Sequence, residues 1–234
     1  MILTILTYNI HRGIGSDKRM DLGRIMKVIR ESEADIVALQ EVDHVVAEGA
    51  RMPNIKKLAE AAGFHVYEQT VRVLLRETGV MGYGNTTLVR LPPEQVTYHD
   101  ITIPGREARG MIELRLKIKG FLLRIMNTHL GLQQWERHRQ FNRLGALLKD
   151  STQDTVLAGD FNEWWPGSGA LREMDRLFGE QQPAISTWPS QRPFFALDRI
   201  WVKPAHYLRY LGAYITPLTR VASDHLPLMA RLEI

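Results

Sequence analysis

Two polar motifs lie directly beside short apolar runs and carry side chains that can do chemistry. Gly159-Asp160-Phe161-Asn162 follows Thr155-Val156-Leu157-Ala158, and Ser223-Asp224-His225 precedes Leu226-Pro227-Leu228-Met229-Ala230. Apolar runs of this length are typical of buried strands, which hold polar groups rigidly at the rim of a sheet. Carboxylates, amides and imidazoles gathered at such a rim suit a divalent metal ion and a phosphate ester.

Three upstream motifs place similar side chains beside apolar runs: Thr7-Tyr8-Asn9-Ile10-His11, Gln40-Glu41-Val42 and Asn127-Thr128-His129-Leu130. Glu41 at the end of a strand is either a solvated carboxylate or a ligand for Mg²⁺, which prefers oxygen. Asp160 and Asn162 flank Phe161, so in an extended segment they point the same way and could act together on water and a phosphoryl oxygen. An ordinary Asx turn is the alternative for this pair.

His129 and His225 are the candidate acid–base pair. An imidazole titrates near neutral pH, so it can accept a proton from water or donate one to a leaving oxygen. The alternative for each is a hydrogen-bonded core histidine. The other histidines are expected to be structural, with His11 left open (positions 11, 44, 65, 99, 138 and 206).

Three further residues are candidates for contacts with a substrate. Asn85 is either an amide at the site rim or a turn residue, and Arg109 either contacts phosphate or pairs with a surface glutamate. Trp164, next to Trp165, could stack on a ring, dip into a lipid interface or pack in the core. Trp188 is expected to pack under the last loop.

The elements that must position these groups are strands and a few helices. Strand-like runs cover residues 2–8, 36–39, 86–89, 111–118, 122–126, 156–158, 199–202 and 226–232, and helical periodicity covers 22–32, 54–62 and 135–148. No long linker interrupts the chain, so residues 1–234 are expected to form a single domain. Residues 70–84 and 163–195 are expected to be the loosest loops.

A weak internal repeat indicates how the sheets are arranged. A strand ending in Asn9 and His11, a helix and a strand ending at Glu41 are echoed by the same order around Asn127, His129 and Asp160. Two such halves predict two facing sheets with a site at their shared rim.

Composition sets broader limits. A chain of 234 residues with 44% hydrophobic and 24% charged residues is ordinary for a globular protein with a sizeable core. The absence of cysteine excludes disulfides, thiolate zinc sites and a cysteine nucleophile. The net charge of +4, with 22 arginines against 8 lysines, permits an anionic substrate without requiring nucleic acid. No signal-peptide pattern or transmembrane segment is visible, so a cytoplasmic location is expected.

Taken in order, the motifs resemble the endonuclease/exonuclease/phosphatase superfamily. This superfamily includes pancreatic-type deoxyribonucleases, abasic-site endonucleases, neutral sphingomyelinases and inositol-polyphosphate phosphatases. The matching motifs span essentially the whole chain: Tyr8-Asn9-Ile10-His11, Gln40-Glu41, Gly84-Asn85, Asn127-Thr128-His129-Leu130, Gly159-Asp160-Phe161-Asn162, Leu197-Asp198-Arg199-Ile200 and Ser223-Asp224-His225. The likeness is greatest to short bacterial members of unassigned substrate.

The resemblance implies an α/β fold, specifically a four-layer αββα sandwich with two mostly antiparallel sheets face to face and helices outside. It implies that Glu41 is the main metal ligand, with Asn9 and Asp224 nearby. It also implies that Asp198 hydrogen-bonds His225, whereas a surface carboxylate is the alternative for Asp198. The implied catalytic set is His129, Asp160, Asn162, Asp198 and His225.

These observations predict a Mg²⁺-dependent phosphoesterase, with a phosphodiesterase favoured and Mn²⁺ as a substitute ion. Water attacks in line, oriented by Asp160 or deprotonated by His225. An unspecified phosphodiester ranks first as substrate, a phospholipid or related headgroup second and DNA third. His11 and His129 count against repair of damaged DNA, because abasic-site endonucleases carry an acidic residue at the first position and no histidine at the second.

Several alternatives remain open at this stage. Nucleic acid and a peripheral membrane contact are both compatible with the sequence, and residues 71–75 or the two tryptophans could form an apolar lip. A non-catalytic binding module on the same scaffold is the remaining alternative, which the intact set of acidic residues and His225 disfavours. The oligomeric state is not determined by the sequence.

Overall fold

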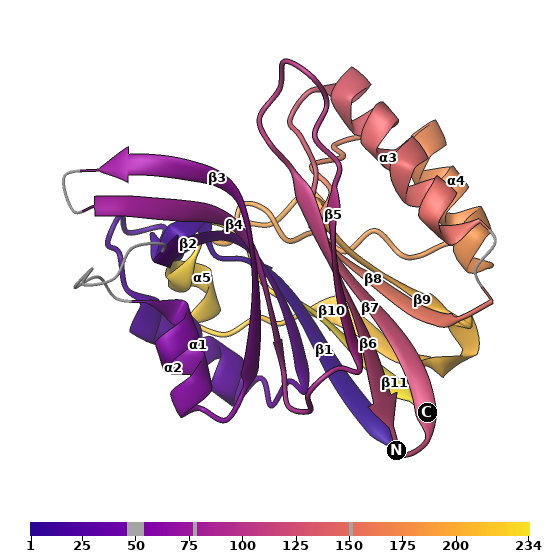
Figure 1. Ribbon diagram of the computed structural model, residues 1–234, viewed down its shortest axis with the longest axis horizontal. Helices are drawn as coiled ribbons and strands as arrows, with labels where there is room; N and C mark the ends of the chain where they lie inside the picture. Colours follow the sequence, from indigo (N-terminus) through magenta and orange to yellow (C-terminus); the bar gives the residue numbers. More distant parts are fainter. Residues whose placement is uncertain (46–53, 77–78, 150–151) are drawn as a thin grey trace.

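The computed structural model describes residues 1–45, 54–76, 79–149 and 152–234 and shows two β-sheets packed face to face (Figure 1). The first sheet has the order β10 (Leu208–Ala213), β11 (Leu228–Glu233), β1 (Ile2–Asn9), β2 (Ile36–Val45), β4 (Gly79–Val89) and β3 (His65–Arg76). The second has the order β5 (Gln95–Asp100), β6 (Gly110–Ile118), β7 (Phe121–His129), β8 (Asp154–Asp160) and β9 (Asp198–Lys203).

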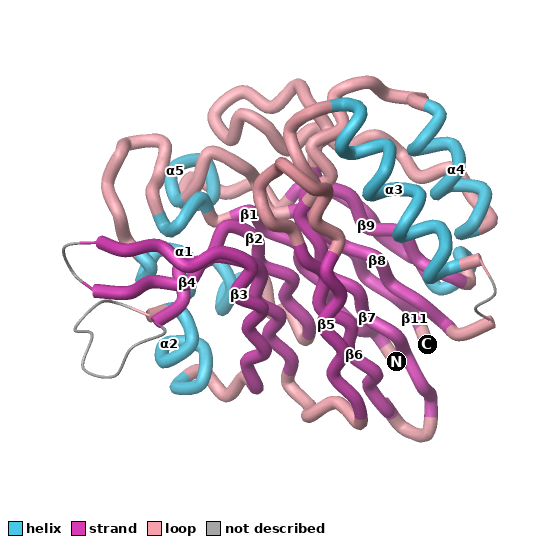
Figure 2. Tube along the Cα trace, turned by 45° about the horizontal axis from the view of Figure 1, so that its top comes forward, coloured by secondary structure: helices cyan, strands magenta, loops and turns pink. Residues whose placement is uncertain are grey.

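Helices cover the outer faces of both sheets (Figure 2). The first sheet carries α1 (Leu22–Glu31), α2 (Ile55–Ala61) and α5 (Thr219–Ala222), and the second carries α3 (Gln134–Leu148) and α4 (Gly169–Phe178). Short 3₁₀ turns cover His11–Gly13 and Ala205–Tyr207. The αββα sandwich predicted from the resemblance is confirmed.

Most strand pairs are antiparallel, and the parallel ones build the site. β1 pairs with β2 in parallel through the α1 crossover, and β7 pairs with β8 in parallel through α3. These are the two strand–helix–strand halves that the sequence repeat predicted. Because strands in a parallel pair end at the same edge of a sheet, Asn9 and Glu41 finish together, as do His129 and Asp160.

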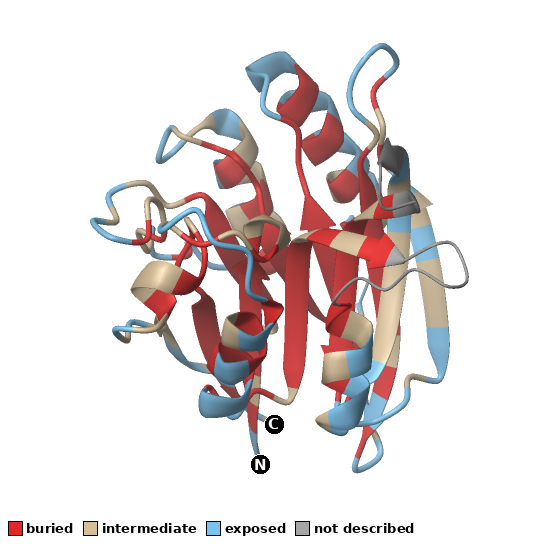
Figure 3. Cartoon of the chain, turned by 90° about the vertical axis from the view of Figure 1, so that its left-hand side faces the viewer, coloured by how far each residue is buried: buried red, intermediate tan, exposed pale blue. Residues whose placement is uncertain are grey.

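Three clusters of buried apolar side chains hold the sandwich together. Figure 3 shows the buried residues concentrated along the strands and on one side of the helices. The central cluster lies between the sheets and includes Ile5, Ile112, Leu114 and Val156. The outer clusters lie beneath α1 and α2 on one side and beneath α3 and α4 on the other. Each helix therefore buries one apolar stripe against a sheet, which is the main source of its stability.

The expectation of loose loops at 70–84 and 163–195 was wrong in part. Residues up to 76 and from 79 onward form the β3–β4 hairpin, and α4 lies inside the second stretch. Gly84 is required inside β4, because a Cβ atom there would lie 2.0 Å from the Gln69 carbonyl oxygen beside a bulge. Glycine in this stretch therefore marks close strand packing instead of a loop.

No helix in the part of the chain that the structure describes is long and apolar enough to cross a membrane.

A buried amide cluster joins the two sheets directly beneath the site. The Asn127 side-chain nitrogen, on β7, lies 3.2 Å from the Leu39 carbonyl, 3.0 Å from the Thr86 carbonyl and 3.1 Å from Thr87 Oγ1. Gln40 Nε2 donates to Asn127 Oδ1 at 2.8 Å. Since Gln40 precedes Glu41 and Asn127 lies two residues before His129, these bonds set how closely the two halves of the site approach.

Replacing Asn127 with alanine is expected to lower the free energy of unfolding by about 2–4 kcal/mol, because the amide and carbonyl groups that it bonds would be left buried without partners. Urea unfolding followed by circular dichroism measures the change. Asn142→Ala, on the exposed face of α3, is the matched control and should stay within about 0.5 kcal/mol of the original protein. Equal stability of the two variants would contradict the role given to Asn127.

Candidate active site

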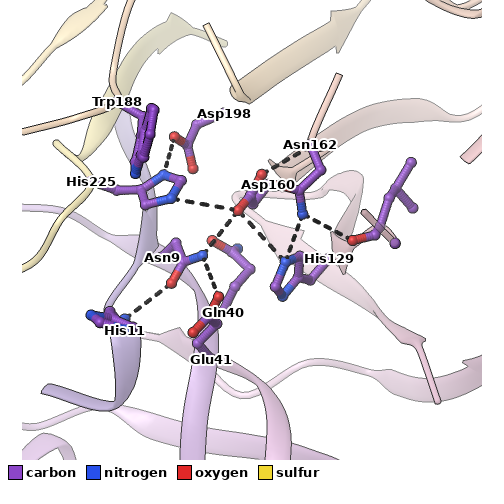
Figure 4. Close-up of polar contacts among 12 residues, drawn as sticks. Asn9, His11, Gln40, Glu41, His129, Asp160, Asn162, Trp188, Asp198 and His225 are labelled. Atoms are coloured by element: carbon purple, nitrogen blue, oxygen red, sulfur yellow. Dashed lines mark hydrogen bonds and ion pairs between the residues drawn. The ribbon is translucent and has the colours of Figure 1, made fainter. Parts of the chain in front are cut away.

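Polar side chains from both sheets meet at one end of the sandwich, where the loops gather (Figures 2 and 4). At their centre lies Asp160, whose carboxylate is 1% exposed. Asn9 Nδ2 donates to Asp160 Oδ2 at 2.9 Å, while His129 Nε2 lies 3.6 Å and His225 Nε2 3.8 Å from the same oxygen. One carboxylate oxygen therefore faces an amide and two imidazoles that come from three different parts of the chain.

Asp160 and Asn162 do not lie in an extended segment, contrary to the expectation. Asn162 has φ 50°, and its backbone N–H donates to Asp160 Oδ1 at 2.9 Å, so the motif forms an Asx turn. The turn still directs both side chains into the site. Asn162 Nδ2 donates to the Leu130 carbonyl and to His129 Nε2, each at 3.0 Å.

His225 is held by Asp198, as the resemblance implied. His225 Nδ1 donates to Asp198 Oδ2 at 2.8 Å, and Thr187 Oγ1 donates to the same oxygen at 2.5 Å. All three side chains are buried. Nδ1 is thereby committed to Asp198, which leaves Nε2 directed at Asp160 (Figure 4).

The pKa values of both His225 and Asp160 are raised, but for different reasons. Burial lowers the pKa of His225, but the carboxylate of Asp198, aided by Asp160 and Asp224, outweighs burial and raises it to about 10. Burial raises the pKa of Asp160 above its ordinary value; the charge of His225 opposes this and that of Asp198 adds to it. His225 is therefore positively charged at neutral pH.

His129 differs from His225. Burial lowers the pKa of His129 well below 6.5, and the positive charges of Arg109 and His225 lower it further. Because the Asn162 amide nitrogen can only donate, His129 Nε2 accepts its hydrogen bond and the imidazole is neutral. The two histidines therefore have different protonation states.

Glu41 and Asn9 form the oxygen-rich side of the site. Glu41 has φ 55° at a bulge in β2, and its Oε1 accepts from Asn9 Nδ2 at 3.1 Å. The same Asn9 nitrogen bonds Asp160, so one amide bridges a carboxylate from each sheet. Asn9 Oδ1 accepts the His11 backbone N–H at 3.0 Å, which orients the amide.

The segment that carries Asp224 is bonded to Asn9, because Oγ of the preceding residue, Ser223, donates to the Asn9 carbonyl at 2.8 Å. The Asp224 side chain is 40% exposed. Its carboxylate accepts from Trp188 Nε1 at 3.4 Å and lies 3.7 Å from His11 Nδ1. Asp224 is thus an open carboxylate at the rim.

Backbone strain is concentrated at the site. Of the seven non-glycine residues with positive φ in the described part of the chain, four belong to the site or its first loop: His11, Arg12, Glu41 and Asn162. Such conformations are costly and persist where the surrounding contacts enforce them. Arg12 donates three hydrogen bonds to the Asp43 carboxylate, the shortest at 2.7 Å.

The three candidate substrate contacts lie in different settings. Asn85 lies within β4 and not in a turn, and its buried amide donates to the Gly110 carbonyl of β6 at 2.9 Å. Arg109 is buried, pairs with Glu107 at 3.0 Å, and lies near enough to His129 to lower its pKa. Trp164 is half-buried and packs edge-on against Trp188 and Phe195.

Several residues of the site were not anticipated from the sequence. Thr187 holds Asp198, and Trp188, expected only to pack, also contacts Asp224. Tyr83 lies beside Glu41. Burial, together with the charge of that carboxylate, raises the pKa of the Tyr83 phenol. No local pattern marks these residues, because each contact joins positions that are distant in the chain.

Comparison with known proteins places this geometry among relatives. A family model described as "Endonuclease/Exonuclease/phosphatase family" matches residues 6–225. The uncharacterized protein YbhP of Escherichia coli strain K12 is 29% identical over 250 residues, an alignment that covers 98% of this chain and 96% of YbhP.

Solved structures share the fold. An endonuclease/exonuclease/phosphatase from Beutenbergia cavernae superposes with a TM-score of 0.77 at 21% identity, covering 100% of this chain and 72% of that one. D. rerio TDP2, solved with a single-strand DNA product, superposes with a TM-score of 0.69 at 15% identity, covering 100% of this chain and 99% of that one.

Replacing Asp198 with asparagine is expected to lower the pKa of His225, because the charge that outweighs burial would be lost. Since the folded pKa lies above the ordinary value of 6.5, protonated His225 stabilises the original protein. This contribution is fully present below about pH 6.5 and is lost as pH rises through about 10. An NMR titration of the imidazole in EDTA measures the shift, and an unchanged pKa in the variant would contradict this assignment.

Proposed function

Because this chain belongs to the endonuclease/exonuclease/phosphatase family, we propose that it is a divalent-metal-dependent phosphodiesterase acting as one domain over residues 1–234. Family membership makes it a hydrolase of the phosphoesterase type. The proposal adds a diester substrate, a metal ion and a role for each residue of the site. The observation that carries it is the single buried oxygen of Asp160 facing Asn9, His129 and His225.

Asp160 is the proposed general base. Its raised pKa makes the carboxylate a better proton acceptor than an exposed aspartate. His225 is a weaker candidate for this role, because its raised pKa of about 10 keeps it protonated at neutral pH. Asp160 therefore accepts the proton of the attacking water, the water oxygen bonds to phosphorus, and the opposite P–O bond breaks to release an alkoxide, which takes up a proton from solvent.

The remaining polar groups act on the negative charge that develops at phosphorus. The His225 imidazolium, fixed by Asp198 and Thr187, stabilises a phosphoryl oxygen. Asn162 holds neutral His129 by its amide, and so His129 can orient the substrate or a water without adding positive charge. Arg109 contributes a buried positive charge next to His129.

The chain offers two candidate groups of metal ligands. Glu41 and Asp224 supply carboxylate oxygens, and the Asp224 side chain is open to solvent, whereas Asn9 turns its nitrogen to Glu41 and its Oδ1 to the His11 backbone N–H. Asp160, Asp198 and His225 also cluster within 4.8 Å, but all are buried and Asp198 Oδ2 already accepts two hydrogen bonds. The first group fits Mg²⁺ better, since this ion prefers oxygen and keeps several waters; Mn²⁺ accepts similar ligands.

A bound ion at Glu41 would neutralise charge on the phosphoryl and leaving oxygens. The protein's own contribution is to hold Glu41 in place through Asn9, which also bonds Asp160. Glu41, which would hold the ion, and Asp160, the proposed base, are thereby kept in a fixed relation by one amide, and Asn9 couples the two sides of the site.

Phosphodiesters rank before other phosphate esters as substrates. The DNA product in the D. rerio TDP2 structure supports this class, as does the net charge of +4. Nucleic acid and phospholipid headgroups are both diesters within it. A cytoplasmic location, proposed from the sequence, is compatible with either.

Hydrolysis of bis(para-nitrophenyl) phosphate tests the proposal. The original protein should cleave it with Mg²⁺ and lose activity in EDTA. Asp160→Asn, Glu41→Gln and His225→Ala should each lower kcat/KM by at least about 100-fold, because each removes a group acting in the transition state. Release of para-nitrophenol is the measurement.

His65→Ala is the matched control, since His65 is exposed on β3 and should leave kcat/KM unchanged. Circular dichroism confirms that each variant is folded. Full activity in the Asp160 variant would overturn the assignment of the base. Tight binding of the diester without turnover in the original protein would favour a non-catalytic binding module.

A further inference from the structure

A buried ion pair lies behind the site and takes no part in the proposed chemistry. Arg137, on α3, and Glu163, after β8, are both almost fully buried, and Arg137 Nε lies 3.4 Å from Glu163 Oε2. Arg137 also donates to the Leu132 carbonyl at 2.6 Å, and Glu163 Oε1 accepts the Trp165 backbone N–H at 3.2 Å. Burying two charges is costly unless further hydrogen bonds satisfy them, and here those bonds go to two loops of the site.

The residues held by this pair point their side chains outward. The Leu132 side chain is 61% exposed, although buried Arg137 donates to its carbonyl. The Trp165 side chain is 69% exposed, although its backbone N–H donates to buried Glu163. Large apolar side chains that stay exposed on a firmly held backbone indicate a contact surface. We name Leu132, Trp135, Trp165 and Phe194 the apolar lip.

The residues of the lip lie on segments that adjoin the site. Trp135 lies in the first turn of α3 and lines a cavity of about 410 Å³ together with Glu163. Phe194 joins the ring cluster of Trp164, Trp188 and Phe195, and Trp188 contacts Asp224. Leu132 and Trp165 follow His129 and Asn162 by three residues each.

Positive charge flanks the lip. The guanidinium carbons of Arg106 and Arg139 lie 5.8 Å and 5.4 Å from the centre of the Trp135 ring. Arg192 is exposed two residues before Phe194, and neither Arg139 nor Arg192 has an ion-pair partner among the residues that the structure describes. Arg106 is paired with Glu136 at 3.3 Å, so the unpaired positive charge comes from Arg139 and Arg192. Apolar side chains with arginine beside them are complementary to an anionic lipid surface, where aromatic side chains favour the interface.

We propose that the apolar lip docks this protein on bilayers that contain anionic phospholipids. One feature favours lipid over single-stranded nucleic acid. Leu132, which is among the most exposed side chains of the lip, has no ring on which a base could stack. If the proposed function holds, docking would bring the phosphodiesters of lipid headgroups to Asp160. Only the cleavage of headgroups rests on the proposed function; docking itself does not.

Residues 71–75 were the other lip predicted from the sequence. They belong to β3, and the side chains of residues 74 and 75 lie outside the described part of the chain.

Co-sedimentation with vesicles tests docking without requiring turnover. The full chain is mixed in EDTA with vesicles of phosphatidylcholine alone or with about one-third phosphatidylglycerol. We expect binding to the anionic vesicles, and we expect Leu132→Ser/Trp165→Ser/Phe194→Ser to weaken it by about tenfold or more, because three apolar anchors are lost.

Ile2→Ser/Leu91→Ser/Leu122→Ser is the matched control. These three apolar residues are also exposed, and they lie by the opposite strand ends: Ile2 begins β1, Leu122 lies at the start of β7, and Leu91 follows the end of β4. The control should bind vesicles as the original protein does, and equal loss in both triple variants would contradict a specific lip.

Absence of vesicle binding by the original protein would overturn the proposal. Undiminished vesicle binding by the lip variant would also overturn it. Binding of single-stranded oligothymidine that depends on the lip, without vesicle binding, would do the same. Hydrolysis of the soluble diester by the original protein tests the proposed function separately. Vesicle binding without hydrolysis would leave docking standing and remove the proposed function.

Discussion

The burial of one carboxylate constrains most of this structure. Asp160 is almost fully removed from water, and a buried charge is stable only when donors and opposite charges surround it. No single segment supplies them. Asn9 comes from the first sheet, His129 and the Asn162 backbone from the second, and His225 from the loop before the last strand. The environment of Asp160 therefore exists only when the two sheets are packed together.

The amide cluster beneath the site gives that packing its register. Asn127 and Gln40 bond one another and the backbone of β2 and β4. Two sheets that met only through apolar side chains could slide past one another. Hydrogen bonds in a dry interior are directional, so they select one relative position of the sheets. Asn9 also joins the two sheets by hydrogen bonds from its amide, at the rim of the sandwich, where it bonds both Glu41 and Asp160.

The loops around the rim are held by buried polar groups and strained backbone. Thr187 and Trp188 bind the segment that carries Asp224 and His225, while Arg137 and Glu163 hold the loops after β7 and β8. Positive φ at Glu41 and Asn162 turns their side chains in directions that a regular strand would not allow. A rigid rim limits the entropy that must be lost when a substrate is bound.

The order of the motifs was enough to predict the family and the sandwich, because each motif can be recognised in a short stretch of the chain; the same motifs contain Asn9, His129, Asp160 and His225, which the structure brings together. The sequence by itself did not determine the left-handed turn at Asn162, the inter-sheet role of Asn85, helix α4, or the contacts of Thr187 and Arg137. Asn9 and Asp160 are 151 residues apart, and their hydrogen bond exists only once both sheets are packed. The same holds for the opposite protonation of His129 and His225, since burial and neighbouring charge set both pKa values and neither is encoded locally.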